Sequence, residues 1–334
     1  MIFSTTFVIL VTLVLLALIF DFLNGFHDAA NVVATMIASR AMSPRAALAL
    51  AAVANLVGPL IFGVAVASTV GKELVEPGSV TITVVMAALV SASLWNIVTW
   101  WLGIPSSSSH ALAGGIIGGA AAYAGFGVLE MAGLTKIAIA LFLSPVLGFI
   151  IAWISLRLVL YFSRNSSPKI NRQFNRAQLV TATGLALAHG TNDAQKTMGI
   201  ITLGLVTLGF QETFHVPLWV IIASATSIGA GTAFGGWRLI KTLGGKFYRI
   251  RPVHSLTSQF ASAAIILSAS LLGGPVSTTH VVSSAIVGAG AAERRSMVRW
   301  GNMTDILVAW VITVPVTLVL AMGCYFVLRL VLGP

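Results

Sequence analysis

Charged residues are scarce in this chain. Only 8% of its 334 residues are charged, and its mean hydropathy is +0.97, whereas a water-soluble domain carries about 25% charged residues. No Asp, Glu, Lys or Arg lies between Glu76 and Glu130, or between Arg251 and Glu293. Because a helix crosses a bilayer core with about 20 apolar residues, each of these runs is long enough for two crossings. The composition excludes an ordinary soluble domain and predicts an all-α integral membrane protein.

Several signatures of enzymes and metal proteins are also missing. The single Cys324 lies in an apolar run and supports neither a disulfide framework nor a metal site. No spacing of histidines resembles a zinc site. Outside the apolar segments there is no nucleophile–base triad, glycine-rich phosphate loop or nucleotide motif. We therefore expect no enzyme activity, no cofactor and no resident metal ion.

The net charge of +10 does not indicate binding to nucleic acid. Most Lys and Arg residues lie in three short stretches between apolar runs, which is typical of topology signals and lipid contact. The N-terminus has no basic residue before its apolar stretch and no small-residue cleavage site. This favours a first helix that is retained over a signal peptide.

Apolar segments occur in equal number on both sides of a basic stretch. They run over 3–22, 46–70, 79–101, 104–125, 134–157, 177–208, 217–237, 253–272, 276–292 and 303–332. We expect about ten or more transmembrane segments, arranged as repeat 1 (1–157), a basic cytoplasmic linker (158–176) and repeat 2 (177–334). Segments 1–39 and 177–208 are too long for one straight crossing, so a broken or re-entrant helix is expected in each.

Two polar signatures each occur twice in these apolar surroundings. Asn24-Gly-Phe-His-Asp-Ala-Ala-Asn31 is echoed by His189-Gly-Thr-Asn-Asp-Ala-Gln-Lys196, and Pro105-Ser-Ser-Ser-Ser-His110 by Pro275-Val-Ser-Thr-Thr-His280. The aspartates are 165 residues apart and the prolines 170, which is half the chain. Because polar groups are costly inside a membrane, their duplication predicts two repeats that use these residues together.

The loops of the two halves differ in charge. The basic loop near Arg40 and Arg45 corresponds to an acidic one near Glu212, and the loop with Glu130 to one with Arg294, Arg295 and Arg299. The acidic loop with Lys72, Glu73 and Glu76 corresponds to a basic one with Arg238, Lys241, Lys246, Arg249 and Arg251. By the positive-inside tendency, equivalent loops lie on opposite sides of the membrane. We therefore expect inverted-topology repeats with both termini outside, an architecture common among secondary transporters.

Asp28 and Asp193 are candidate coupling-ion residues. An intramembrane carboxylate must be protonated, paired or bound to a cation, since an isolated ion in hydrocarbon is very costly. The alternative interpretation is a structural ion pair with a neighbouring helix, and Asp21 and Asp305 fit that alternative better. Lys196 lies three residues after Asp193 and at the repeat position of Asn31. Its ammonium either pairs with Asp193, takes the place of a bound metal cation or attracts the substrate anion.

The stretches that follow the two prolines are candidate substrate-binding segments. Pro105 and Pro275 suit the first turn of a helix. Hydroxyl groups and free backbone N–H groups at a helix start bind anions, and two such starts can face one central point. The candidate residues are Ser106, Ser107, Ser108, Ser109, His110, Ser277, Thr278, Thr279 and His280. Helix packing by small hydroxyl residues is the alternative, and each histidine can equally be a neutral ring bonded to a carbonyl.

At these residues the sequence resembles the inorganic phosphate transporter (PiT) family in its bacterial low-affinity form. The resemblance implies a phosphate symporter with inverted repeats, often a homodimer, in which Asp28, Asn31, Asn192 and Asp193 bind substrate and coupling ion. His27, Gln195 and Lys196 depart from the pattern of many sodium-coupled members. They resemble a proton-coupled bacterial branch that accepts divalent metal–phosphate complexes, so we also assign His27, Gln195 and Lys196 to the coupling ion.

The sequence thus leads to the hypothesis of a proton-coupled inorganic phosphate symporter in a prokaryotic plasma (inner) membrane. The alternatives are a sulfate–proton symporter of the same fold, a sodium-coupled phosphate symporter and, in a different class, a passive anion channel. Monohydrogen phosphate can donate a hydrogen bond to a carboxylate and sulfate cannot, which favours phosphate. The paired titratable residues favour coupled transport over passive flux.

Overall fold

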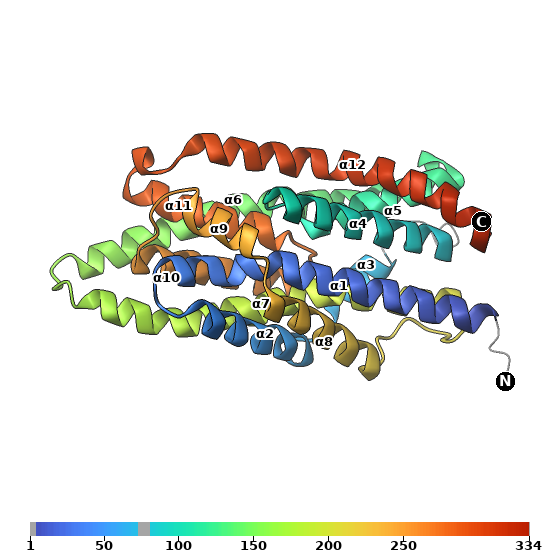
Figure 1. The fold of residues 1–334 in the computed structure, drawn as a ribbon, viewed down its shortest axis with the longest axis horizontal. Helices are drawn as coiled ribbons and strands as arrows, with labels where there is room; N and C mark the ends of the chain where they lie inside the picture. Colours follow the sequence, from blue (N-terminus) through green and yellow to red (C-terminus); the bar gives the residue numbers. More distant parts are fainter. Residues whose placement is uncertain (1–4, 73–80, 334) are drawn as a thin grey trace.

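The computed structural model describes residues 5–72 and 81–333, and these form an elongated bundle of helices that lie roughly along one axis (Figure 1). The first half of the chain contains α1 (Thr5–Ala38), α2 (Pro44–Ile61), α3 (Ala65–Lys72), α4 (Ile82–Leu102), α5 (Ser108–Ala124) and α6 (Met131–Ser163). The second contains α7 (Ile170–Thr207), α8 (Leu218–Phe234), α9 (Trp237–Gly245), α10 (Pro252–Leu271), α11 (Thr278–Glu293) and α12 (Trp300–Leu332). Short 3₁₀ turns, η1 (Phe126–Val128) and η2 (Arg295–Met297), precede α6 and α12.

The two halves pack against each other reciprocally. Helix α1 packs on α8 while α7 packs on α2, and α5 packs on α12 while α11 packs on α6. Both termini lie at one end of the bundle, and the junction of α6 and α7 lies at the other (Figure 1). The first half of the chain therefore starts at the terminal end and finishes at the far end, and the second half starts at the far end and finishes at the terminal end.

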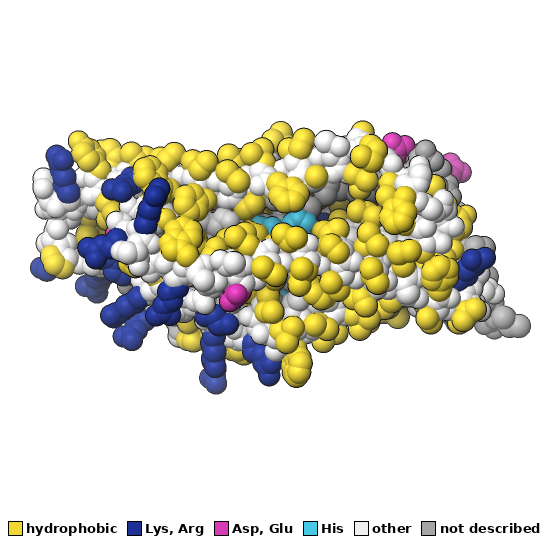
Figure 2. All heavy atoms as spheres, turned by 90° about the horizontal axis from the view of Figure 1, so that it is seen from above, with side chains coloured by type: hydrophobic (Ala, Val, Ile, Leu, Met, Phe, Trp, Pro, Cys, Tyr) yellow, Lys and Arg dark blue, Asp and Glu magenta, His cyan; other side chains and the backbone are white. Residues whose placement is uncertain are grey.

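Basic side chains gather at the end opposite the termini (Figure 2). The long flanks between the ends are covered by apolar side chains, as expected for a surface that faces lipid. Glu73 and Glu76, from the loop expected to be acidic, lie outside the described residues.

Within residues 5–72 and 81–333, five helices are long and apolar enough to cross a membrane, and the pair α8 and α9, bent by 71°, makes a sixth if counted as one span. The five are α1, α2, α4, the segment Phe142–Ser163 of α6, and α12. Helices α5 and α11, of 17 and 16 residues, are shorter than the roughly 20 residues of a full crossing. The structure is all-helical over the described residues, and ten or more crossings stay a prediction.

The expectation of broken helices at the Asp-containing segments is wrong. Helices α1 and α7 run without interruption through Asp28 and Asp193. The breaks lie instead between α4 and α5 and between α10 and α11, where Gly103 and Gly273 adopt positive φ values of 69° and 74°. Each helix end closes with the paired backbone hydrogen bonds of a Schellman motif, which glycine favours because it has no Cβ. Asn31 of α1 and Lys196 of α7 find partners at the starts of α11 and α5, so these backbones need not open to satisfy them.

One further expectation about helix boundaries needs correction. Pro105 and Pro275 do not lie in a first helical turn, because α5 and α11 begin three residues later, at Ser108 and Thr278. Ser107 and Ser277 are the N-caps, and a serine hydroxyl there satisfies an N–H that the helix start leaves unpaired. The basic segment 158–176 is mostly helical, since α6 continues to Ser163 and α7 starts at Ile170, and its role as a cytoplasmic linker stays a prediction.

Candidate functional site

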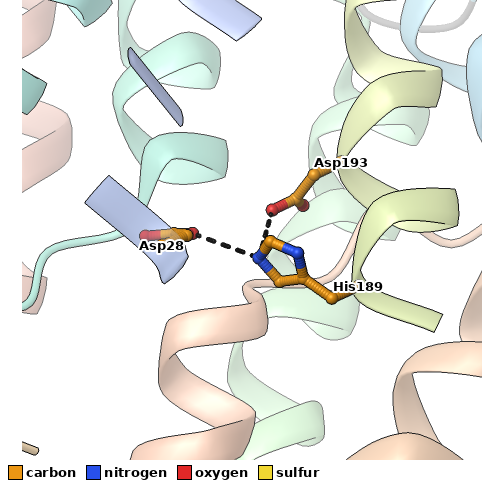
Figure 3. Close-up of side chains that lie close together, drawn as sticks. All are labelled: Asp28, His189 and Asp193. Carbon is orange, nitrogen blue, oxygen red and sulfur yellow. Dashed lines mark ion pairs between the residues drawn. The ribbon is translucent and has the colours of Figure 1, made fainter. Parts of the chain in front are cut away.

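Two carboxylates and an imidazole meet where α1 and α7 pack side by side (Figure 3). Asp28 comes from α1, and His189 and Asp193 come from successive turns of α7. The Nε2 atom of His189 lies 3.2 Å from Asp193 Oδ2 and 3.9 Å from Asp28 Oδ2. All three side chains are at most 1% exposed. The imidazole ring therefore lies between two buried carboxylates, one from each helix.

Lys196 supplies a fixed positive charge to this cluster. Its side chain is buried, and its ammonium donates to the carboxylate of Asp193, to Ser109 Oγ at 2.6 Å and to the Val276 carbonyl at 3.3 Å. A carboxylate, a hydroxyl and a carbonyl oxygen are also the ligand types that hard cations prefer. The ion pair of Lys196 with Asp193, which was one interpretation of the sequence, is present. The oxygens around the ammonium are also compatible with another interpretation, in which Lys196 takes the place of a bound metal cation.

The start of α11 reaches both carboxylates through hydroxyl groups. Thr278 Oγ1 lies 3.3 Å from an oxygen of Asp28 and 3.2 Å from an oxygen of Asp193. Thr279 Oγ1 lies 3.3 Å from both oxygens of Asp28 and accepts a hydrogen bond of 3.0 Å from Asn31. The helix start therefore faces the acidic pair, as a hydroxyl-rich ligand-binding segment would.

His27 is the second imidazole at Asp28. Its Nδ1 atom lies 2.7 Å from Asp28 Oδ1, and its Nε2 atom lies 3.2 Å from Thr99 Oγ1 on α4. Ser106 donates to the same Thr99 hydroxyl at 2.8 Å. This chain of contacts links the segment before α5 to Asp28.

The starts of α5 and α11 also touch each other. Ser109 donates to the Val276 carbonyl at 3.0 Å, and the rings of His110 and His280 contact each other at a tilt of 35°, with centroids 4.5 Å apart. Both rings line a largely apolar cavity of about 790 Å³ between α6 and α12, where His280 also stacks on Trp310. Histidine side chains are visible in a hollow on this flank (Figure 2). His110 and His280 thus lie on the other side of the helix starts from the carboxylates.

Five other candidates from the sequence have different surroundings. Ser107 and Ser277 cap their helices, and Ser108 is buried in the first turn of α5. Asn192 donates to Ser270 at 2.9 Å and to the Gly274 carbonyl at 3.3 Å. Gln195 accepts a bond of 2.6 Å from Val66 N at the start of α3. None of these contacts reaches Asp28 or Asp193.

Sequence reasoning left three residues of the site unassigned. His189 was considered only as one of four motif histidines, able to carry a proton or to stay neutral, although its spacing of four from Asp193 places both side chains on one helix face. Asn55, from α2, lies 3.3 Å from His189 Nδ1. Neither Asn55 nor Thr99 belongs to one of the duplicated motifs.

Asp21 and Asp305 were expected to be structural ion pairs, and neither forms one among the described residues. Asp305 is exposed on α12. Asp21 is completely buried on α1, and neither of its oxygens has a hydrogen-bond partner. The two residues therefore have opposite environments.

The groups that could together hold a metal ion include Asp28, His189 and Asp193. Each offers one ligand atom, a carboxylate oxygen or an imidazole nitrogen, and these atoms lie within 4.8 Å of one another. Asp193 is already paired with the Lys196 ammonium and Asp28 with His27. Each carboxylate is thus already paired with a nitrogen-containing side chain of the protein itself.

A model of the phosphate transporter family matches residues 24–321, which include every residue of this cluster. The chain belongs to the phosphate transporter family. A probable low-affinity inorganic phosphate transporter of Bacillus subtilis (strain 168) is 46% identical over 331 residues, covering 97% of this chain and 98% of that protein. One from Rhizobium meliloti (strain 1021) is 45% identical over 330 residues, covering 98% and 99%. A solved structure titled "The sodium-dependent phosphate transporter" superimposes with a TM-score of 0.90 over 97% of this chain and 100% of that one, at 24% identity.

Membership of the phosphate transporter family makes this chain a membrane transport protein and not an enzyme. At 24% identity the structural likeness is evidence for the fold alone. The choice of coupling ion must therefore be argued from this chain's own residues.

Proposed function

We propose that this protein imports inorganic phosphate into a prokaryotic cell together with protons. Relatives of nearly equal length carry the name of low-affinity inorganic phosphate transporters. The observation that supports proton coupling is the position of His189, whose Nδ1 faces an amide oxygen and whose Nε2 lies close to two carboxylates.

The Nδ1 side of His189 faces an amide oxygen. Thr232 donates its hydroxyl proton to the Ile228 carbonyl at 2.9 Å, so its oxygen accepts from Asn55 Nδ2 at 2.8 Å. This fixes the Asn55 amide with its oxygen toward His189 Nδ1. An amide oxygen only accepts, so Nδ1 carries a proton. Nε2 makes no hydrogen bond but lies 3.2 Å from Asp193 Oδ2 and 3.9 Å from Asp28 Oδ2, so a second proton on the ring would be favoured by two negative charges.

The same reasoning applies to His27. Thr99 donates its hydroxyl proton to the Trp95 carbonyl at 2.8 Å and therefore accepts from His27 Nε2. Nδ1 of His27 donates to Asp28. Both ring nitrogens carry protons, so His27 is an imidazolium.

Protonation of these two histidines decides the charge of the site. Asp28, Asp193 and Lys196 together carry one net negative charge, which repels phosphate. With His27 and His189 protonated the site carries one net positive charge. Because charge interactions are strong in a water-poor interior, phosphate binds well only after the protons. Proton and phosphate binding are thereby coupled.

We place phosphate between the starts of α5 and α11, with Ser106–Ser109 on one side and Ser277–Thr279 on the other. Hydroxyl groups and backbone N–H groups at two helix starts favour an oxyanion. A monohydrogen phosphate can donate its proton to Asp28 or Asp193, which sulfate cannot do. The site would open around phosphate by parting contacts such as that of Ser109 with Val276.

Lys196 supports proton coupling over sodium coupling. Its ammonium lies among oxygens of the kind that bind a hard cation, so the chain supplies a permanent positive charge there. The reciprocal packing of the halves supports inverted repeats, and the basic end supports a cytoplasmic location opposite both termini. Transport as a metal–phosphate complex and assembly as a homodimer belong to the same proposal through the family resemblance.

Uptake of radiolabelled phosphate into proteoliposomes tests this function. Accumulation driven by a proton gradient, unaffected by excess sulfate, is the expected result. Accumulation that needs sodium, or that sulfate blocks, would contradict the proton or the phosphate assignment.

Substitution of Asp193 tests the site. Asp193→Asn removes the counter-charge of Lys196, and we expect uptake to be abolished while membrane insertion is retained. Asp305→Asn, at an exposed position on α12, is the matched control and should leave uptake unchanged. Normal uptake by Asp193→Asn would remove this residue from the mechanism.

A further inference from the structure

Asp21 is a buried carboxyl group to which the transport cycle described above assigns no role. It lies on α1 and is 0% exposed, and both of its oxygens lack a hydrogen-bond partner among the described residues. An ionised carboxylate in such a place is very costly. A carboxyl group without a hydrogen-bonded cation avoids that cost by holding a proton.

The surroundings of Asp21 form a small polar region inside the bundle. Asn24, one turn further along α1, is also 0% exposed, and both of its amide atoms lack partners. The buried hydroxyl of Thr197 on α7 approaches Asp21 as a weak donor outside standard hydrogen-bond geometry, and it has no other partner among the described residues. Natural proteins rarely leave several buried polar groups unpaired at one place, so this region is suited to a bound proton or to water that delivers one.

The charges that face Asp21 come from one neighbouring helix. Asp193 and Lys196 of α7 lie within electrostatic range of it. Helices α4 and α8, which also pack on α1, contain no ionisable side chain. Arg45 of α2 is exposed. Helices α9, α10 and α11 meet α1 beyond Gly25, at Phe26, His27, Asp28, Ala34 and Thr35.

This environment explains why Asp21 differs from the other two carboxylates. Asp193 holds the Lys196 ammonium and Asp28 holds His27, whereas Asp21 bonds to neither. Lys196 is already engaged by three oxygens. A proton is therefore the counter-charge that Asp21 can acquire without rearranging the cluster.

We propose that Asp21 is a separate proton-binding site of this transporter, through which a coupling proton enters from the terminal end of the bundle. Asp21, Asn24 and Asp28 are spaced by three and four residues and share one face of α1. Seven residues of helix place Asp21 about 10 Å from Asp28. Since α1 begins at the terminal end (Figure 1), Asp21 lies nearer to that end along α1 than Asp28 does.

This inference rests on the proposed proton-coupled phosphate transport and adds one proton site to it. Asp21→Asn has the shape of the protonated carboxyl but cannot release a proton. We expect it to fold normally and to exchange phosphate across the membrane at the wild-type rate, because exchange needs no net proton movement. Accumulation driven by a gradient of one pH unit should fall about tenfold for each coupled proton lost.

The experiment compares four proteins in proteoliposomes: wild type, Asp21→Asn, Asp21→Glu and Asp305→Asn. Phosphate exchange, phosphate accumulation and the number of protons entering per phosphate are measured in each. Asp21→Glu keeps a carboxyl group and should restore accumulation, and the exposed Asp305→Asn should match the wild type. Infrared difference spectra of wild type and Asp21→Asn should show the loss of one protonated carboxyl band.

Each contrary outcome has a distinct meaning. Wild-type accumulation and proton count in Asp21→Asn would overturn the inference. So would failure of Asp21→Asn to fold, because the protonated form would then not be the native one. Loss of exchange in a folded Asp21→Asn would place Asp21 in substrate binding instead. A wild-type protein without proton-driven accumulation would overturn the proposed function itself.

Discussion

Replacing Lys196 with methionine tests whether the buried cation holds the two helix starts and the acidic pair together. Lys196 is 1% exposed, and its ammonium contacts Asp193, Ser109 and the Val276 carbonyl. Methionine fills nearly the same space without charge. Removal of one partner from a buried ion pair leaves an uncompensated charge and costs about 3–5 kcal/mol. We expect Lys196→Met to be destabilised by about that amount.

The double variant Asp193→Asn/Lys196→Met separates this charge effect from packing. Removing both charges leaves no buried ion unpaired, so most of the lost stability should return. The measurement is the free energy of unfolding of the two single variants and the double variant in mixed detergent micelles. Coupling between the two sites should reach about 2–3 kcal/mol. If the single effects add to within about 0.5 kcal/mol, the ion pair contributes no stability and the reasoning fails.

A smaller residue at position 196 adds a test of ion specificity. Lys196→Ala opens a space surrounded by oxygens of Asp193, Ser109 and Val276, whereas Lys196→Met fills it with an apolar chain. Sodium should therefore raise the melting temperature of Lys196→Ala and leave that of Lys196→Met unchanged, with choline chloride as the ionic-strength control. A binding ion stabilises the folded state in proportion to the logarithm of its concentration. Equal responses of both variants would show that the oxygens do not form a cation site.

Two further predictions concern packing and pH. A Cβ on Gly190 would lie 2.3 Å from the backbone oxygen of Asn55, so Gly190→Ala should lower the free energy of unfolding by at least about 1–3 kcal/mol. A Cβ on Gly184, on the same helix, meets nothing within 4 Å, so Gly184→Ala should raise the free energy of unfolding by up to about 1 kcal/mol. Unfolding measurements on both variants check this. Burial raises the pKa of Glu293, but hydrogen bonds from His254 and Arg251 outweigh it and hold the pKa below its ordinary value of 4.5. This group therefore contributes stability above its unfolded pKa and loses it as the pH falls through the folded one. Glu293→Gln should flatten the acid side of the stability–pH curve, while the control Glu212→Gln, at an exposed position, should leave it unchanged.

The sequence indicates the residues of the site better than their contacts. Asp28, Asp193, Lys196, Thr278 and Thr279 come together because polar groups in an apolar chain must satisfy one another. The length of α1 and α7 suggested broken helices, since a sequence does not show that partners on other helices satisfy Asn31 or Lys196. The roles of Asn55 and Thr99 depend on packing across more than 70 residues of sequence. Periodicity within one segment contains no information about such contacts.

The two aspartates show why the differences between the repeats matter as much as their similarity. Asp28 and Asp193 occupy equivalent positions, but Asp28 pairs with His27, whose repeat equivalent is Asn192, and Asp193 pairs with Lys196, whose equivalent is Asn31. One carboxylate thus has an imidazole partner, and the other has a lysine ammonium. Under the proposed proton coupling, loss of a proton from His27 would remove positive charge on the side of Asp28, while Lys196 would keep the contact of α7 with Ser109 and Val276. Proton release would then weaken phosphate binding without dismantling the site.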